Sequence, residues 1–160
     1  METRIVDRPA FRLVGHAARV PLIHRGINPH IRRHIAALPA EEHVRLTALG
    51  DTEPGGLLAV CDDVDADYDE GSELTYLHGV AVSPSTPVPG DLDVIEVPAG
   101  RWLVIGAVGP HPQTLQRTWA TAAAEWFPFH PWRLRPGPEI VAPGDLSTAT
   151  CEVWLPVEPA

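Results

Sequence analysis

A short internal repeat constrains the fold of this chain more than any other feature of its sequence, because a repeated segment predicts a repeated structural unit. The segment 7–21 aligns without gaps on the segment 96–110. Each copy opens with an acidic residue and a Pro-Ala turn, continues through an apolar run and ends at a proline. The identical pairs are Pro9/Pro98, Ala10/Ala99, Arg12/Arg101, Ala18/Ala107 and Pro21/Pro110. Since proline cannot donate a hydrogen bond within a sheet, each copy predicts a turn and then a strand with a definite end.

A helix is predicted after each copy of the repeat. After the first copy, Asn28 is a suitable N-cap for a helix that Pro39 ends, and the apolar residues between them recur at helical spacing. A second short helix is predicted over 41–49, which has acidic residues in its first turn. After the second copy, Pro112 opens a helix that Pro128 ends. The two halves of the chain therefore follow the same order.

Two strands are predicted after the helical part of each half. Their ranges are 57–61 and 73–82 in the first half, and 139–142 and 148–157 in the second. The order strand-helix-strand-strand, met twice, predicts an α+β fold with a curved antiparallel sheet and helices on one face. The other face must be filled by side chains or be hollow. We expect one domain over residues 1–160, with repeat one at about 1–90 and repeat two at about 91–160.

Charge and hydropathy narrow the classes of partner. The chain has 12 basic and 21 acidic residues and a net charge of −9, which repels nucleic acid at long range. Its longest apolar run, 102–108, is far shorter than the roughly 20 residues of a membrane helix, and its N-terminus lacks the apolar stretch of a signal peptide. We therefore expect a soluble cytoplasmic protein, a monomer or weak homodimer, that binds neither membranes nor, by itself, nucleic acid.

The residues that commonly bind metals do not occur in metal-binding patterns. Cys61 and Cys151 are isolated, as expected for small buried apolar side chains. His30 and His34 lie four residues apart on a predicted helix, but the two arginines between them oppose a cation, so a solvated basic face is expected. The acidic run 62–70 lacks the glycine and the final glutamate of a calcium-binding EF-hand loop and is expected to be a solvated hairpin loop. We expect neither a metal nor a cofactor.

Five tryptophans are many for a chain with three phenylalanines and two tyrosines. Trp119 and Trp126 fall on the apolar stripe of the third predicted helix, so we expect them in the core. Trp102 lies in a predicted strand and Trp132 in a predicted loop, and either ring could stack on a ligand or lie under a cation.

Four segments together carry a resemblance to a known family. They are YLHGV at 76–80, the PAG turn at 98–100, the helix end WFP at 126–128 and the closing strand CEVWLPV at 151–157. Over nearly its whole length the chain resembles the GyrI-like effector-binding domains, a family that includes the ligand-sensing halves of the transcription factors BmrR and Rob. The resemblance implies a pseudo-twofold axis between the two repeats, helices on one face of the sheet and an aromatic-lined ligand cleft on the other.

The resemblance also implies a set of site residues. In the drug-sensing members of the family a buried glutamate faces cationic aromatic compounds, and Glu152 in the closing strand is similar to it in position. Burial would raise the pKa of such a carboxyl group and a bound cation would lower it, which makes the group a cation selector. The strand before the closing one usually carries Glu-x-Tyr in the family, whereas here Val141 stands at the tyrosine position after Glu139. The second departure is that no helix-turn-helix precedes the domain, as expected for a stand-alone version. The predicted ligand-binding residues are Glu152, Tyr76, Trp102, Trp132, Trp154 and His78.

The resemblance implies three possible functions of different classes. The leading hypothesis is a stand-alone, multidrug-type binding protein that captures lipophilic, cationic aromatic compounds beside a buried glutamate. The alternative is a hydrolase of reactive cyclopropane-bearing compounds, in which Glu152 activates water in the same cleft. A third hypothesis is a protein-interaction module of the gyrase-inhibitor type, in which the acidic run 62–70 mimics nucleic-acid charge.

Overall fold

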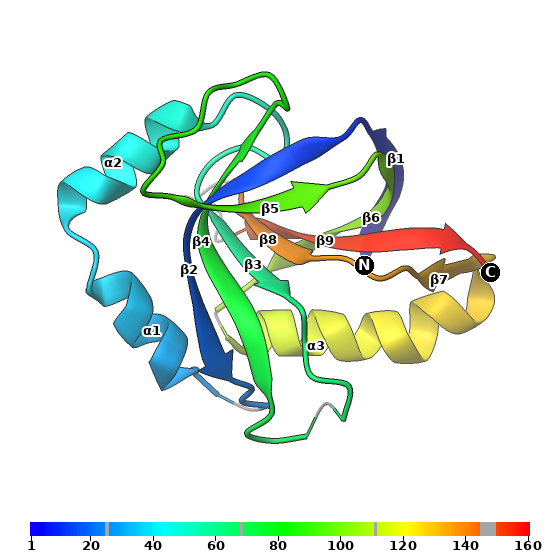
Figure 1. Ribbon diagram of the computed structural model, residues 1–160. Helices are drawn as coiled ribbons and strands as arrows, with labels where there is room; N and C mark the ends of the chain where they lie inside the picture. The colour runs from blue at the N-terminus through cyan, green and yellow to red at the C-terminus, as the bar shows by residue number, and fades with distance from the viewer. Residues whose placement is uncertain (25, 68, 111, 145–149) are drawn as a thin grey trace.

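The computed structural model describes residues 1–24, 26–67, 69–110, 112–144 and 150–160. In these residues one antiparallel sheet of nine strands carries three α-helices (Figure 1). The strands are β1 (Glu2–Arg8), β2 (Phe11–Pro21), β3 (Leu58–Asp62), β4 (Glu73–Val82), β5 (Asp93–Val97), β6 (Gly100–Val108), β7 (Trp132–Leu134), β8 (Glu139–Pro143) and β9 (Thr150–Pro159). The helices are α1 (Pro29–Ala36), α2 (Ala40–Leu49) and α3 (Gln113–Thr121).

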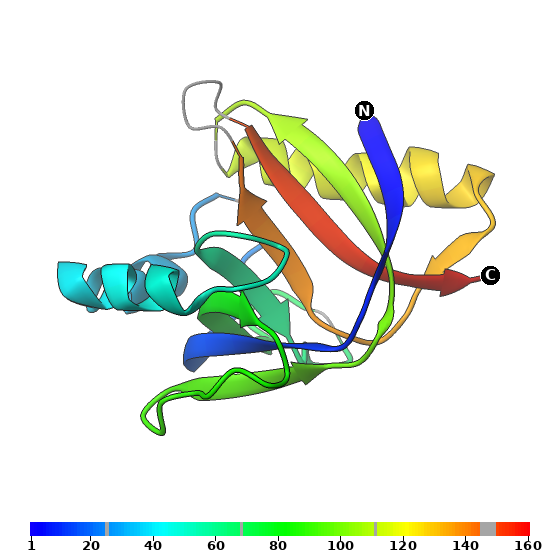
Figure 2. The same ribbon diagram turned by 90° about the horizontal axis from the view of Figure 1, so that it is seen from above.

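The strands on the two sides of the middle of the sheet follow equivalent orders. The order is β1-β6-β9-β8-β3-β4-β2-β5, with β7 also pairing with β9. The strands β8, β9 and β6 on one side of the β3–β8 seam therefore correspond to β3, β4 and β2 on the other, as a pseudo-twofold relation requires. Figure 2 shows the sheet curling without closing into a barrel. This arrangement confirms the predicted α+β fold with two strand-helix-strand-strand repeats.

The repeats interlock through strands that were not predicted. Strand β1 pairs with β6 of the other repeat, and β5 pairs with β2. Pro9 interrupts the chain between β1 and β2 and Pro98 between β5 and β6, as the sequence predicts. The register nevertheless continues from the pair Arg8–Gly100 to the pair Phe11–Val97, so these positions interrupt strands and the predicted turns do not form. The closing strand was predicted over 148–157, and its first two positions lie outside the described residues.

The helices begin where the sequence predicts and end slightly differently. The Asn28 side chain accepts hydrogen bonds from the backbone N–H groups of His30 (3.0 Å) and Ile31 (3.3 Å), which confirms it as the N-cap of α1. After α3 the chain continues in a wider π-helical turn, Ala122–Trp126. Trp126 is buried as predicted, whereas Trp119 packs against the same cluster and is only partly buried. None of the described helices is both long and apolar enough to cross a lipid bilayer.

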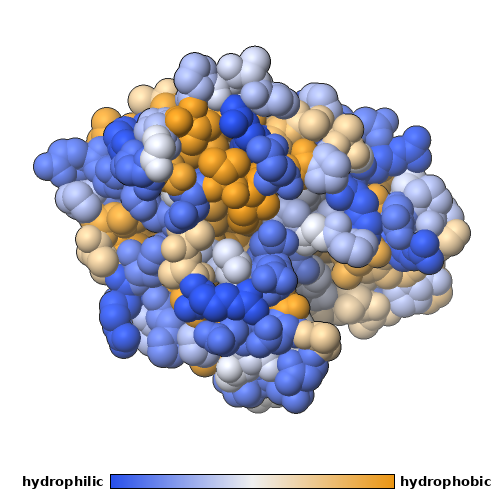
Figure 3. All heavy atoms as spheres, in the orientation of Figure 1, coloured by the Kyte–Doolittle hydropathy of each residue, from blue (hydrophilic) through white to orange (hydrophobic). Residues whose placement is uncertain are grey.

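All three helices cover the same face of the sheet. Helix α3 and its continuation pack on β6 and β9. Both α2 and α1 pack on β2 and β4, α2 near Val14 and Val80 and α1 near Val20 and Leu74. The outer surface in the view of Figure 3 is largely hydrophilic, with apolar residues gathered in its upper middle.

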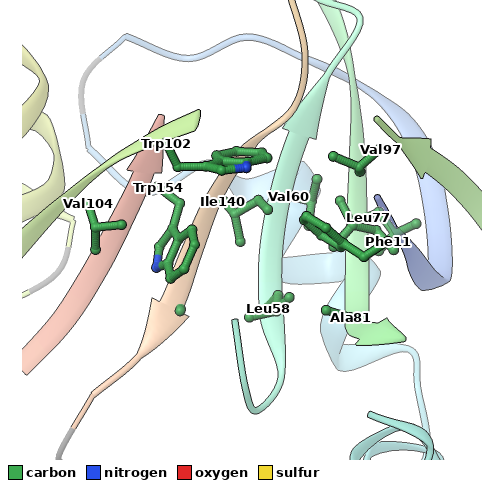
Figure 4. Close-up of a cluster of buried hydrophobic side chains, with 12 residues drawn as sticks. Phe11, Leu58, Val60, Leu77, Ala81, Val97, Trp102, Val104, Ile140 and Trp154 are labelled. Carbon is green, nitrogen blue, oxygen red and sulfur yellow. The ribbon is translucent and has the colours of Figure 1, made fainter. Parts of the chain in front are cut away.

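The middle of the opposite face is filled by the main apolar core (Figure 4). The buried residues of this cluster are Phe11, Leu13, Leu58, Val60, Leu77, Ala81, Val97, Trp102, Val104, Ile140, Ala142 and Trp154. The ring of Trp102 packs against Trp154 at 6.1 Å and against Phe11 at 6.0 Å between centroids. Side chains from both repeats therefore fill the middle of the face where the resemblance placed a cleft.

Candidate functional site

Two of the predicted ligand-binding tryptophans belong to the core. Trp102 is 0% exposed and Trp154 is 2% exposed. One face of the Trp102 ring is covered by the guanidinium group of Arg135, whose central carbon lies 5.1 Å from the ring centroid. Neither ring is open to a ligand in this conformation, and both contribute to packing between the two repeats.

Glu152 lies in β9 on the same face as Trp154, as predicted, but it is already engaged. Its Oε2 atom accepts a hydrogen bond from Arg4 Nη1 at 2.8 Å, and its Oε1 atom accepts one from Trp154 Nε1 at 3.3 Å. Its side chain is 33% exposed. The structure thus places Glu152 in an ion pair between β1 and β9 at the margin of the core.

The other predicted residues lie on the helix-covered face. Tyr76 is buried beneath α1, where its ring meets the edge of His34 at 6.0 Å. The His78 Nε2 atom lies 2.9 Å from the Nδ1 atom of His43 in α2. Trp132 in β7 is half-buried against the α3 cluster, with the Arg101 guanidinium 5.3 Å from its ring. Trp102, Trp154 and Glu152 therefore lie together on one face of the sheet, whereas Tyr76, His78 and Trp132 lie on the helix-covered face.

An open groove of about 880 Å³ lies where the two repeats meet. Strands β3 and β8 form the seam between the repeats, and the last pair in their register is Cys61 opposite Glu139. The groove begins at this end of the seam. Its lining residues are Cys61, Asp62, Asp63, Val64, Thr75, Ile95, Leu134, Arg135, Pro136, Gly137, Glu139 and Pro156. Aliphatic side chains and prolines form its apolar part, in contrast to the aromatic lining that the resemblance implies.

Glu139 is the most unusual ionisable group of this groove. Burial, and then the nearby carboxylate of Asp62, raise the pKa of Glu139 to about 7. No residue in the described part of the chain donates a hydrogen bond to its carboxylate or forms an ion pair with it. A half-buried carboxylate without a partner is costly when charged, so this position favours either a proton or an external cation.

A row of polar side chains crosses three strands beside Glu139. Cys61 of β3 lies opposite Glu139 on one side and opposite Tyr76 of β4 on the other. Burial, and then Glu139 and Asp62, raise the pKa of the Cys61 thiol to about 12. Burial also raises the pKa of the Tyr76 hydroxyl. Both groups therefore stay protonated at neutral pH, and the thiol is not an activated nucleophile.

The sequence contains a feature that indicates Glu139 as a site residue. Glu139 is the first residue of β8, directly after the Pro-Gly-Pro turn at 136–138, and it holds the Glu-x-Tyr position of the family. Strand alternation separates it from Ile140 and Ala142, which belong to the core cluster. What the sequence could not indicate is that Glu152 pairs with an arginine, whereas no arginine of the described residues pairs with Glu139.

The histidines near α1 and α2 are packed at the sheet, so the expectation of a solvated basic face is wrong for His34. Its Nε2 atom lies 2.9 Å from the carbonyl oxygen of His16, and its ring packs on Tyr76. His16 and His78 lie directly opposite each other in β2 and β4, and the His16 ring pairs with Glu42 at 2.8 Å. No group of three or more histidine, cysteine or acidic side chains in the described residues could hold a metal ion.

The acidic run 62–70 is tied to the sheet rather than fully solvated. Arg19 of β2 donates to Asp65 Oδ1 at 2.7 Å and to the carbonyl oxygen of Asp63 at 2.5 Å. Asp63 adopts a positive φ of 47°. The arginine therefore offsets part of the negative charge beside the groove.

Comparison with known proteins agrees with the fold described above. The structure of SAV2435 bound to tetraphenylphosphonium is similar with a TM-score of 0.69 and 20% identity, covering 99% of this chain and 94% of the other. A bacterial protein from Staphylococcus aureus MU50 is similar with a TM-score of 0.66, 18% identity and 99% coverage of both chains. The C-terminal domain of EcmrR is similar with a TM-score of 0.65 and 16% identity, covering 99% of this chain and 98% of the other. No curated protein matches the chain.

The model of one protein family, described as the GyrI-like small molecule binding domain, matches residues 1–158. This match spans both repeats and the groove between them, and it confirms the resemblance carried by the turns and the closing strand. The chain therefore belongs to the GyrI-like family of small-molecule binding domains.

Proposed function

We propose that this domain captures lipophilic organic cations in the groove at the end of the β3–β8 seam, with Glu139 as the counter-charge. The observation that carries the proposal is the unpaired, half-buried carboxylate of Glu139 in the wall of a groove of about 880 Å³. Grooves that bind drug-sized molecules have volumes of roughly 300–1,000 Å³. The groove is therefore large enough for such a ligand.

The electrostatics of the groove favour a positive charge next to Glu139. A cation at this carboxylate would supply the partner that the described residues lack, and it would remove the cost of the unpaired charge. Asp62 lies nearby and adds a second negative charge. Ile95, Leu134 and Pro156 offer apolar surface for the rest of the molecule. Such surfaces have few directional demands, which is compatible with broad specificity.

A structural neighbour supports the chemical class of ligand. SAV2435 has been solved in complex with tetraphenylphosphonium, a cation whose charge is enclosed by four phenyl rings. This ion cannot donate a hydrogen bond, so an acidic site attracts it through charge and apolar contact. Tetraphenylphosphonium is therefore a suitable first probe for this chain.

The hydrolase hypothesis assigned the activation of water to Glu152. Both carboxylate oxygens of Glu152 already accept hydrogen bonds, from Arg4 and Trp154. A general base must lie within reach of the bound substrate and its water, and Glu152 does not line the groove. Glu152 therefore lends this hypothesis no support, and we do not propose it.

The test is titration of tetraphenylphosphonium by isothermal calorimetry at pH 8, where Glu139 is ionised. We expect Glu139→Gln to weaken binding about tenfold to a hundredfold, since loss of a desolvated ionic contact costs about 1–3 kcal/mol. Glu152→Gln is the matched control and should leave the affinity within about twofold. Neutral triphenylphosphine oxide should bind both Glu139 forms equally. No binding below millimolar concentration would refute the proposal, and a loss confined to Glu152→Gln would move the site to Glu152.

A further inference from the structure

Arg135 holds a positive charge in the wall of the same groove. Its backbone N–H donates to the carbonyl oxygen of Pro156 at 3.0 Å, and its Nη2 atom donates to the carbonyl oxygen of Arg101 at 3.3 Å. Its guanidinium group lies over the Trp102 ring, 5.1 Å from the centroid. A side chain at Gly100 would place a Cβ atom 2.7 Å from Nη2, so glycine leaves the space that the guanidinium occupies. Arg135 is therefore fixed at several points.

The charge of Arg135 has no counter-ion among the described residues. Burial lowers the pKa of this guanidinium, and the only carboxylate that raises it is that of Glu158. Glu158 is bonded to another arginine, Arg133, at 2.9 Å. The Arg135 Nε atom is buried and has no hydrogen-bond partner in the part of the chain that the structure describes. Within the described ranges, this half-buried cation therefore has no partner of opposite charge.

The opposite charge in this groove is also unpaired. Neither Glu139 nor Asp62 forms an ion pair with any residue in the described ranges, and Arg135 pairs with neither of them. All three side chains line the groove. Unpaired charges in a partly desolvated site are costly, and a ligand that compensates both signs removes more of this cost than one that compensates a single sign.

We propose that the groove selects amphoteric organic molecules, in which a cationic group faces Glu139 and Asp62 and a carboxylate faces Arg135. This inference rests on the proposed function and narrows its class of ligand. A guanidinium group presents several N–H donors in a planar fork that matches the two oxygens of a carboxylate. The stacking of Arg135 on Trp102 keeps this fork in place before the ligand arrives, which limits the entropy lost on binding.

Two dyes that differ at one group test the inference. Rhodamine 110 carries a cationic ring system and a free carboxylate, and rhodamine 123 is its methyl ester and is purely cationic. In fluorescence polarisation titrations at pH 8, we expect rhodamine 110 to bind about tenfold more tightly than rhodamine 123, as for hydrogen bonds to a charged group. Arg135→Gln should remove this preference and leave the affinity for rhodamine 123 unchanged or higher.

Controls separate the inference from the proposed function. Arg133→Gln removes a neighbouring exposed charge and should keep the preference for rhodamine 110. Arg135→Lys keeps the charge without the planar fork and should keep part of the preference, which gives a second measurement if Arg135→Gln folds poorly. Equal or weaker binding of rhodamine 110 to the wild type, with rhodamine 123 still bound, overturns the inference and leaves the proposed function intact. Failure of both dyes and of tetraphenylphosphonium to bind overturns both.

Discussion

Asp7 lies directly opposite Arg101 in the β1–β6 ladder, and Arg101 Nε donates to Asp7 Oδ1 at 2.9 Å. The equivalent residues of the other copy, Glu96 and Arg12, lie opposite each other in the β5–β2 ladder. In the sheet register, the acidic residue that opens each copy of the repeat thus lies opposite the arginine of the other copy. The gapless alignment of the two segments is therefore confirmed by the sheet register.

The Asp7–Arg101 ion pair should contribute little to stability. Its side chains are 77% and 50% exposed, and exposed pairs are worth about 0–1 kcal/mol. We expect Asp7→Asn to lower the free energy of unfolding by less than about 1 kcal/mol, and by less still in 1 M salt. Urea unfolding at low and high salt is the measurement. A loss above about 2 kcal/mol, unchanged by salt, would show that this pair fixes the register.

Trp102 should matter for the fold far more than for the ligand. It is fully buried between the repeats against Trp154 and Phe11. Trp102→Ala should lower the free energy of unfolding by about 3–5 kcal/mol, as other large-to-small core substitutions do. Trp132→Ala is the control, because that ring is only half-buried, and it should cost clearly less. A stable Trp102→Ala variant that has lost only ligand binding would contradict this assignment.

Glu139 should make the stability of the protein depend on pH. Its pKa rises from an ordinary 4.5 to about 7 in the folded state, so the folded state holds its proton more tightly than the unfolded state does. This contribution to stability is present below pH 4.5 and is lost as the pH rises to about 7. Above pH 7, Glu139→Gln should be more stable than the wild type by up to about 3 kcal/mol, at 1.36 kcal/mol for each pKa unit.

Urea unfolding of both forms between pH 4.5 and pH 8 checks this expectation. Glu152→Gln is a suitable control, because Arg4 already compensates Glu152. The difference between wild type and Glu139→Gln should grow with pH and then level off. A difference that does not change over this range would place the Glu139 carboxyl group in contact with water.

His78 should make the fold less stable as the pH falls, whereas Glu139 makes it less stable as the pH rises. Burial, and then the charges of His43, His34 and His16, lower its pKa from 6.5 to about 4. Its neutral form therefore stabilises the fold above pH 6.5, and this contribution, up to about 3 kcal/mol, is lost as the pH falls towards 4. We expect His78→Asn to have a shallower decline in stability between pH 6.5 and pH 4 than the wild type. His30→Asn is the control, because it also removes one histidine, and its stability should decline over this pH range as that of the wild type does.

The sequence alone determined the repeat, the order of elements and the positions where prolines interrupt strands. These features depend on local chemistry: Asn28 caps a helix, Pro9 and Pro98 interrupt strands, and apolar spacing distinguishes helix from strand. The strands β1 and β5 were missed, because each is stabilised by pairing with the other repeat rather than by its own pattern of residues. The loop predicted at Trp132 is wrong as well, because Trp132–Leu134 forms the short strand β7 on β9.

Only the tertiary structure decided which charged groups remain without partners. Two glutamates near the ends of neighbouring strands look alike in sequence, yet Arg4 from the distant strand β1 reaches Glu152 and no described cation reaches Glu139. Strand alternation likewise predicts that Trp102 and Tyr76 each point to one particular face of the sheet. Only the packing of the two repeats decides that side chains fill the face on which Trp102 lies. Burial and ion pairing depend on contacts between residues far apart in the chain, so they are properties of the assembled fold.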